Sequence, residues 1–213
     1  MNHTKEHMIQ SVETALNYLD DTTKNNLPPS VLGLEGMSGP KYRQFANHLI
    51  RNVRDVRYLE IGIWHGSTSI SAFYNNRENI LKHWLIDNWC EFGGPKDSFL
   101  NNFQSILGYV PNAIEKDCFD IKPSDYEIND VNIYFYDGWH TEESQRKAVE
   151  HYASCLTNPA ILMVDDYDWA HVKNGTQQGL ESTGLKVEYK KEIVGNGNST
   201  GWHNGCVIMV VSK

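Results

Sequence analysis

The chain has 213 residues, 40% of them hydrophobic and 22% charged, which is enough for one well-buried core and too few for two full-sized domains. Acidic residues outnumber basic ones by 27 to 19, and the net charge of −8 opposes the counterion release that drives nucleic-acid binding. We therefore expect no nucleic-acid partner. The apolar stretches are too short to span a membrane, and the N-terminus lacks the apolar core of a secretion signal, which predicts a cytoplasmic protein without a membrane partner.

Residues 1–36 are predicted to be distinct from the main domain, residues 37–213. Thr4 can cap a helix that runs to about Tyr18, and the apolar residues of this helix share one face. A loop rich in Gly, Pro and Asn follows and is expected on the surface. The helix is expected to dock on the domain's own core, or alternatively to form a lid or the contact of a homo-oligomer.

From Pro40 onward, strands alternate with helices, which predicts an α/β fold with a mostly parallel sheet covered by helices on both faces. Strands are expected at 57–61, 83–86, 113–116, 131–136 and 160–164. Helices are expected at 40–52, 67–74, 96–107, 142–156 and 171–183.

The last two predicted strands, residues 186–194 and 205–212, have no helix between them and should pair antiparallel. A Rossmann-like parallel sheet that ends in an antiparallel hairpin is the layout of the class I methyltransferases. A NAD-binding domain would more often continue with another strand and helix.

The segment from Tyr58 to Ser71 predicts a binding turn between the first strand and its helix. Glu60 and Gly62 stand at the end of the strand, and Gly66 precedes the first residues of the helix, Ser67 and Thr68. Glycine permits a sharp turn and a close approach to a ligand, and free N–H groups at a helix start favour an anionic group.

Trp64 stands where a dinucleotide-binding fingerprint would need its second glycine, and this disfavours a pyrophosphate ligand. Asp87 ends the second predicted strand, where a carboxylate can accept from both ribose hydroxyls. Asp117 follows the third strand and could accept from an adenine amine. A tight turn without a ligand, or an exposed loop aspartate at Asp117, are the alternatives.

A second group of polar residues follows the next two strands. Asp137 ends one strand and His140 comes three residues later, while Asp165 and Asp166 end the following strand. The carboxyl ends of parallel strands meet at one crevice, so we expect these groups to converge beside the cofactor. The three aspartates suit Mg²⁺ or a similar divalent ion, with Asp168 as a competing ligand.

With Asp137 and His140 as catalytic residues, this set suits the transfer of a methyl group to a hydroxyl. Positioning contributes about 7 kcal/mol or more to such a displacement, the metal lowers the hydroxyl pKa, and His140 removes the proton. Helix capping and ion pairing of the aspartates are the alternative. The remaining candidates are flat aromatic walls for a sugar ring: Trp64, Trp89, Trp139 and Trp169.

The strings LEIGIWHGSTS, LIDNW, YDGWH and VDDY, in this order, resemble the class I S-adenosylmethionine-dependent methyltransferases. They are most similar to the metal-dependent sugar O-methyltransferases of the macrocin type and their short bacterial and phage relatives, over roughly residues 37–172. The resemblance implies S-adenosylmethionine as cofactor. It also implies a Glu-x-Gly-x-x-x-Gly turn from Glu60 to Gly66, a metal-binding Asp137, a catalytic His140 and an acidic pair at Asp165 and Asp166.

The chain departs from that family at Asp165, where the acidic pair can begin with Glu instead, and we expect the sizeable extra N-terminal region of the antibiotic-pathway members to be missing. The acceptor is expected to be a sugar, glycan or other small molecule. Two other functions are the alternatives: a nicotinamide-dependent oxidoreductase, and a non-catalytic binding module that keeps the cofactor fold. Trp64 and the terminal hairpin argue against the first, and His140 beside three carboxylates argues against the second.

Overall fold

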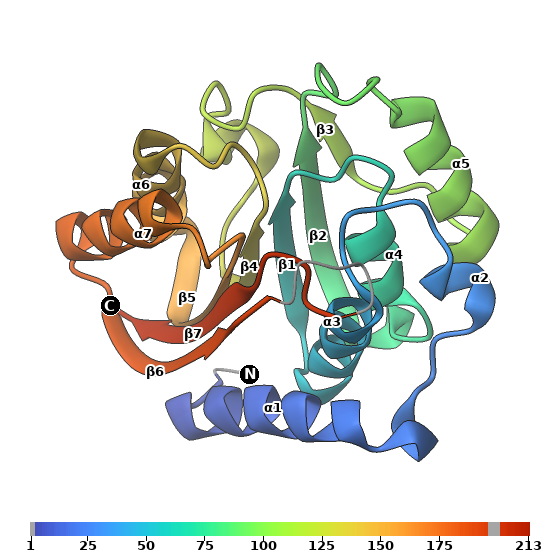
Figure 1. The fold of residues 1–213 in the computed structure, drawn as a ribbon. Helices are drawn as coiled ribbons and strands as arrows, with labels where there is room; N and C mark the ends of the chain where they lie inside the picture. Colours follow the sequence, from blue (N-terminus) through green and yellow to red (C-terminus); the bar gives the residue numbers. More distant parts are fainter. Residues whose placement is uncertain (1–2, 196–200) are drawn as a thin grey trace.

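The computed structural model describes residues 3–195 and 201–213 and shows one seven-stranded sheet between two layers of helices (Figure 1). The strands are β1 (Val56–Ile61), β2 (Ile80–Asp87), β3 (Ala113–Glu115), β4 (Val131–Tyr136), β5 (Leu156–Asp165), β6 (Lys186–Ile193) and β7 (Cys206–Ser212). The α-helices are α1 (Lys5–Asn17), α2 (Pro29–Leu32), α3 (Pro40–Asn52), α4 (Ser67–Phe73), α5 (Lys96–Leu107), α6 (Glu142–Tyr152) and α7 (Ala170–Thr183).

The strand order in the sheet is β3-β2-β1-β4-β5-β7-β6. Strands β1 to β5 are parallel, whereas β7 runs antiparallel to both β5 and β6. The parallel sheet and the C-terminal antiparallel hairpin are therefore confirmed. The order reverses at β1, so the crevice beside the carboxyl ends of β1 and β4 is the topological switch point where ligands of open α/β sheets bind.

Two hydrophobic layers cover the sheet, as the runs of apolar residues in the central strands require. One contains buried side chains of α1, α3, α4 and α5, and the other contains those of α6 and α7 (Figure 1). The core is most complete at β4 and β7, where nearly every residue is buried. The rigid strands fix the positions of the loops that follow them.

The N-terminal helix α1 docks on this core. Met8, Val12 and Ala15 are fully buried in the layer that also contains α3, and the Lys5 ammonium contacts Glu188 of β6 at 2.9 Å. Thr4 caps the helix as predicted, because its side chain accepts a hydrogen bond from the His7 N–H. The role of residues 1–36 as an oligomer contact stays a prediction.

Three predicted boundaries were wrong by three or four residues, and the first is the start of β2, at Ile80 rather than His83. The predicted helix 142–156 ends at Tyr152, and β5 begins at Leu156 rather than Ala160. Leu156 pairs with Val131, and the shift in register that follows accommodates Pro159, which lacks an N–H for the ladder. The predicted surface loop also contains the short helix α2.

Two further predictions concern a membrane partner and the connection between the last two strands. Within residues 3–195 and 201–213, no helix combines the length and the apolar character needed to cross a membrane. The predicted connection between β6 and β7 falls partly on residues 196–200, which lie outside the described residues.

Candidate active site

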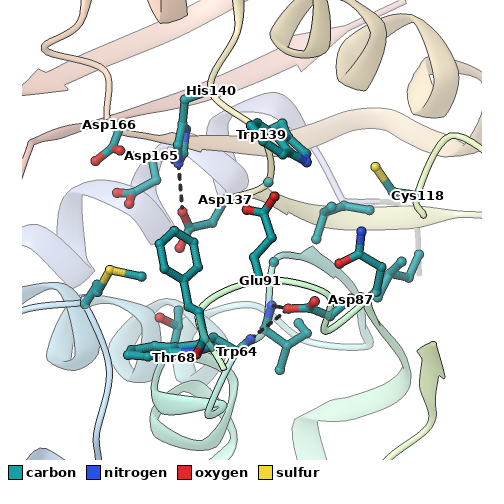
Figure 2. Close-up of a pocket in the computed structure, with 18 of the residues that line it drawn as sticks. Trp64, Thr68, Asp87, Glu91, Cys118, Asp137, Trp139, His140, Asp165 and Asp166 are labelled. Carbon is teal, nitrogen blue, oxygen red and sulfur yellow. Dashed lines mark hydrogen bonds and ion pairs between the residues drawn. The ribbon is translucent and has the colours of Figure 1, made fainter. Parts of the chain in front are cut away.

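A cavity of about 720 Å³ opens at the carboxyl ends of the parallel strands. Its lining includes the ends of β1, β2, β4 and β5 and the loops that follow them (Figure 2). Of the predicted site residues, the following line it: Gly62, Trp64, Ser67, Thr68, Asp87, Asp117, Asp137, His140, Asp165 and Asp166. One cavity therefore brings together both predicted groups of residues.

Gly62 and Gly66 both have positive φ angles, 87° and 82°, and both are needed for packing. A Cβ atom on Gly62 would lie 1.9 Å from the Asp137 carbonyl oxygen, because β1 and β4 are paired neighbours and the chain stays close where they end. A Cβ on Gly66 would lie 2.5 Å from the ring of Phe99. Gly66 does not line the cavity and its backbone lies close to α5, while its predicted approach to a ligand stays a prediction.

Glu60 was predicted to bind the cofactor, and the structure places it elsewhere. Its side chain is 1% exposed, does not line the cavity and accepts a hydrogen bond of 2.6 Å from the Tyr58 hydroxyl. Burial raises the pKa of this carboxyl to about 8, against a smaller opposing effect of the Tyr58 hydrogen bond. Because β1 is buried on both faces, Glu60 points into protein rather than into the crevice.

Asp87 has a different set of partners from the predicted ribose hydroxyls. Its Oδ2 accepts from the N–H groups of Ile63 and Trp64 at 2.7 and 2.8 Å, and its Oδ1 accepts from the Trp89 N–H at 2.7 Å (Figure 2). The carboxylate therefore ties the turn after β1 to the loop after β2. Asp117 likewise accepts from the Phe119 N–H at 2.8 Å, and both aspartates line the cavity.

Trp64 and Trp89 fix each other through their indole N–H groups. The Trp64 indole donates to the Phe92 carbonyl, and the Trp89 indole donates to the Trp64 carbonyl, each at 3.0 Å. Trp64, Trp89 and Phe92 all have φ angles of 46–48°, a left-handed conformation that costs energy for side chains of this size. Such strain persists only where the surrounding contacts enforce it, and it is common at functional sites.

Four side chains meet below the ends of β4 and β5 (Figure 2). The His140 Nε2 atom lies 3.3 Å from Asp166 Oδ2 and 3.8 Å from Asp137 Oδ1, and Asp165 is close enough for its charge to act on the Asp137 carboxyl. Asp166 is 6% exposed and has a φ of 54°, so its backbone is also left-handed. The predicted convergence of these four residues is therefore found.

Crowding of the carboxylates changes their acidity. Burial, and then the charges of Asp165 and Asp166, raise the pKa of Asp137 well above its ordinary value. Burial and the charge of Asp166 raise the pKa of Asp165 to about 7. Burial lowers the pKa of His140, and the charge of Asp166 opposes this only in part. The imidazole is consequently neutral near pH 7, as a general base must be.

The three aspartates do not stand as a prepared metal site. Among the described residues, no group of three or more His, Cys, Asp or Glu side chains is arranged to hold a metal ion. Asp168, the predicted competing ligand, instead accepts from the Gly195 N–H at 2.8 Å and does not line the cavity. The Mg²⁺ prediction is thus not confirmed, although carboxylate oxygens are the donors that such an ion prefers.

Sequence reasoning missed several residues of the cavity wall. Phe92 is 70% exposed, and Met37 and Ser38 come from the N-terminal loop. The glycine pair that follows Phe92 and the glycines around Met37 were signals of special backbone, but their position depends on tertiary contacts. All four predicted tryptophans line the cavity, and Trp139 and Trp169 are 57% and 39% exposed there.

No family model and no curated protein sequence matches this chain. Solved structures do match. A provisionally assigned O-methyltransferase from Klebsiella pneumoniae is 18% identical with a TM-score of 0.66, and the match covers 97% of this chain and 99% of that one. An O-methyltransferase from Bacillus cereus in complex with SAH is 12% identical with a TM-score of 0.64, and the match covers 96% and 100%.

The chain has a methyltransferase fold. TrmN from Thermus thermophilus also shares it, with 12% identity and a TM-score of 0.59 over 87% of this chain, which spans about half (52%) of TrmN. The mostly parallel sheet and the terminal antiparallel hairpin agree with the layout expected from the sequence. At these identities the likeness concerns the fold alone.

Proposed function

We propose that this chain is an S-adenosylmethionine-dependent O-methyltransferase in which His140 is the general base. The observation that carries the proposal is the position of His140 beside Asp137, Asp165 and Asp166 at the switch point of a methyltransferase fold. A scaffold without chemistry has no need to crowd three carboxylates against an imidazole in an open cavity. The likeness to an O-methyltransferase in complex with SAH supports the choice of cofactor.

The cofactor fits along the cavity from the end of β3 to the end of β4. The nucleoside belongs beside Asp117 and Asp87, at the ends of β3 and β2, and the sulfonium belongs beyond the turn at Gly62. Asp87 can bind a ribose hydroxyl through Oδ1, which has a single backbone donor. Ser67 and Thr68 line the cavity where α4 begins after β1. The methyl group then faces His140, across β4 from the nucleoside.

Gln145 supports the proposed role of His140. It is 1% exposed, its Nε2 lies 3.4 Å from His140 Nδ1, and its Oε1 has no hydrogen-bond partner among the described residues. Turning the amide by 180° places Oε1 where it accepts from a protonated Nδ1. In that tautomer the lone pair is on Nε2, which lies 3.3 Å from Asp166 Oδ2, and it would take the proton of the acceptor's hydroxyl. A bound S-adenosylmethionine would supply the methyl group to the hydroxyl oxygen, with its S–CH₃ bond broken, and would leave as S-adenosylhomocysteine.

We also propose that a divalent ion assists the reaction. The crowded carboxylates repel one another, as the raised pKa values of Asp137 and Asp165 indicate, and either protons or a cation must offset this charge. Asp137, Asp165 and Asp166 are the residues that would hold it. When bound, a divalent ion would supply Lewis-acid activation of the acceptor hydroxyl.

The charge of the cavity narrows the class of acceptor. Within the described lining, Lys116 is the sole Lys or Arg side chain, whereas Glu91, Glu142 and the aspartates are acidic. A phosphorylated or carboxylated acceptor would be repelled. Trp139 and Trp169 offer exposed aromatic surface for the apolar face of a ring. We therefore propose a neutral or amine-bearing sugar or other small hydroxylated molecule.

Transfer of a labelled methyl group from S-adenosylmethionine to a panel of neutral, amino and phosphorylated sugars tests this function. We expect transfer to a neutral or amino sugar, a loss in Asp137→Asn, and no change in Asp125→Asn, an exposed aspartate outside the cavity. Repeating the assay with EDTA and then added Mg²⁺ tests the ion separately. If no acceptor in the panel were methylated, the proposed O-methyltransferase activity would be contradicted. Full activity in EDTA would contradict only the proposed need for a divalent ion.

A further inference from the structure

Arg43 of α3 is a buried arginine without an acidic partner among the described residues. Arg43 is 3% exposed, and none of the ion pairs in residues 3–195 and 201–213 involves it. Its guanidinium instead donates to oxygen atoms of the preceding loop, at 2.8–3.3 Å: Val31 O, Leu32 O, Leu34 O, Gly36 O, Ser38 O and Ser38 Oγ. The loop from Val31 to Ser38 is wrapped around one side chain.

The buried charge of Arg43 must be stabilised by hydrogen bonds alone, because no acidic side chain pairs with it among the described residues. Burial of a charge costs several kcal/mol and lowers the pKa of Arg43 to about 10, so the side chain stays charged at neutral pH. Five carbonyl oxygens and the Ser38 hydroxyl offset that cost. Those carbonyls in turn lack strand partners, and Arg43 carries the fan of planar donors that a lysine does not have. The conformation of the loop therefore depends on Arg43.

The other side of the loop faces the cavity. Ser38 Oγ lies 3.0 Å from Ser67 Oγ, and a Cβ on Gly36 would lie 2.0 Å from that same Ser67 atom. Met37 and Ser38 line the cavity together with Ser67. On the far side of the loop, a Cβ on Gly39 would lie 2.0 Å from the Gly201 carbonyl oxygen. The loop is thus pinned between α4 and the segment before β7.

The order of the strands indicates which part of the cofactor this wall meets. The nucleoside is assigned to the ends of β3 and β2, and the reacting methyl group to the side of His140 at β4. Ser67 follows β1, which lies between them. The amino-acid portion of the cofactor remains for the wall that Met37, Ser38 and Ser67 form.

We propose that Arg43 is a positioning residue for the cofactor: by wrapping residues 31–38 it holds Met37 and Ser38 against the amino-acid portion of S-adenosylmethionine. This inference rests on the proposed function. It distinguishes the two ends of the cofactor, because a wall at β1 contributes to binding of the amino-acid portion and does not contribute to binding of the nucleoside.

Calorimetric titrations with S-adenosylhomocysteine and with 5′-methylthioadenosine, which lacks the amino-acid portion, test the proposal. In Arg43→Lys we expect affinity for S-adenosylhomocysteine to fall about tenfold, which corresponds to the loss of one or two net hydrogen bonds, with methylthioadenosine affinity within about twofold of the wild type. Arg51→Lys is the matched control, since Arg51 is on the same helix and contacts only Asn47 in its side-chain hydrogen bond. It should leave both affinities unchanged.

Ser38→Ala is the second variant, for use if Arg43→Lys does not fold, because it keeps the carbonyl partners of Arg43. It should reduce affinity for S-adenosylhomocysteine about threefold to fivefold and leave methylthioadenosine binding unchanged. Equal losses for both ligands, or no loss for either, would overturn the role of Arg43 while leaving the proposed function intact. Failure of the wild-type chain to bind S-adenosylhomocysteine would overturn both.

Discussion

Aspartates end both β2 and β4 at the same edge of the sheet, yet their surroundings are opposite. Asp87 accepts from backbone N–H groups of Ile63, Trp64 and Trp89, which stabilise its charge. Asp137 faces Asp165 and the His140 imidazole, and burial and like charges raise its pKa. The carboxylate at β2 organises the loops, and the one at β4 is left with unbalanced charge. The difference teaches that position at a strand end does not by itself assign a role.

The largest expected effect is on the β4 side of this comparison. Replacing His140 with Gln removes the proposed base, and we expect methyl transfer to slow by about 10²–10⁴-fold, the usual contribution of a general base. Affinity for S-adenosylhomocysteine should stay within about twofold, because His140 lies across β4 from the nucleoside. Measurement of kcat together with the calorimetric affinity checks both parts. A variant with wild-type kcat would remove His140 from the mechanism.

Glu60, on β1 between the two regions, predicts a pH dependence of stability. Its pKa is raised from 4.5 to about 8 in the folded chain, so the unfolded chain loses this proton at lower pH than the folded one. Stability should therefore fall as pH rises from about 4.5 to 8, by on the order of 5 kcal/mol. Glu60→Gln should flatten this part of the pH profile in denaturant titrations. An unchanged slope would show that Glu60 ionises normally in the folded chain.

Asp87→Ala should have a smaller and mixed effect. Loss of the acceptor leaves three backbone N–H groups near the cavity without a partner, which should reduce the free energy of unfolding by about 1–3 kcal/mol. Cofactor affinity should fall as well, since the turn after β1 loses its tie to the loop after β2. Asp97→Ala on α5 is the control in urea titrations. Equal stability of the wild type and Asp87→Ala would contradict the organising role.

The smallest expected change in stability is at Trp139. Its ring is 57% exposed, so Trp139→Ala should change the free energy of unfolding by no more than about 0.5 kcal/mol. The apparent affinity for an acceptor, measured as KM, should weaken while cofactor affinity stays constant. If KM does not change, the acceptor binds elsewhere in the cavity.

The sequence predicted the sheet and the convergence of the site well, and there is a physical reason. Runs of buried residues mark parallel strands, and parallel topology brings their carboxyl ends to one crevice, so Asp137, His140, Asp165 and Asp166 had to meet. The antiparallel pairing of β6 and β7 followed from the absence of a helix between them. These inferences depend only on pattern and topology.

The misplaced residues depend on tertiary contacts that no local pattern contains. Glu60 was expected in the cavity, but the pairing of Tyr58 with its carboxyl holds it in the core. Gly66 was expected beside a ligand, and Phe99 occupies the space that a side chain would need. The wrapping around Arg43 joins residues of α2, the loop after it and α3. In the sequence, the glycines and prolines of this segment indicated a surface loop but not its contact with Arg43.

Titration of S-adenosylhomocysteine into the wild-type chain, with NAD⁺ as the parallel ligand, tests the central claim most directly. The account predicts one-site binding of S-adenosylhomocysteine and no detectable heat with NAD⁺, because Trp64 stands where a pyrophosphate would need a glycine. Binding of NAD⁺ in place of S-adenosylhomocysteine, or of neither, would contradict it.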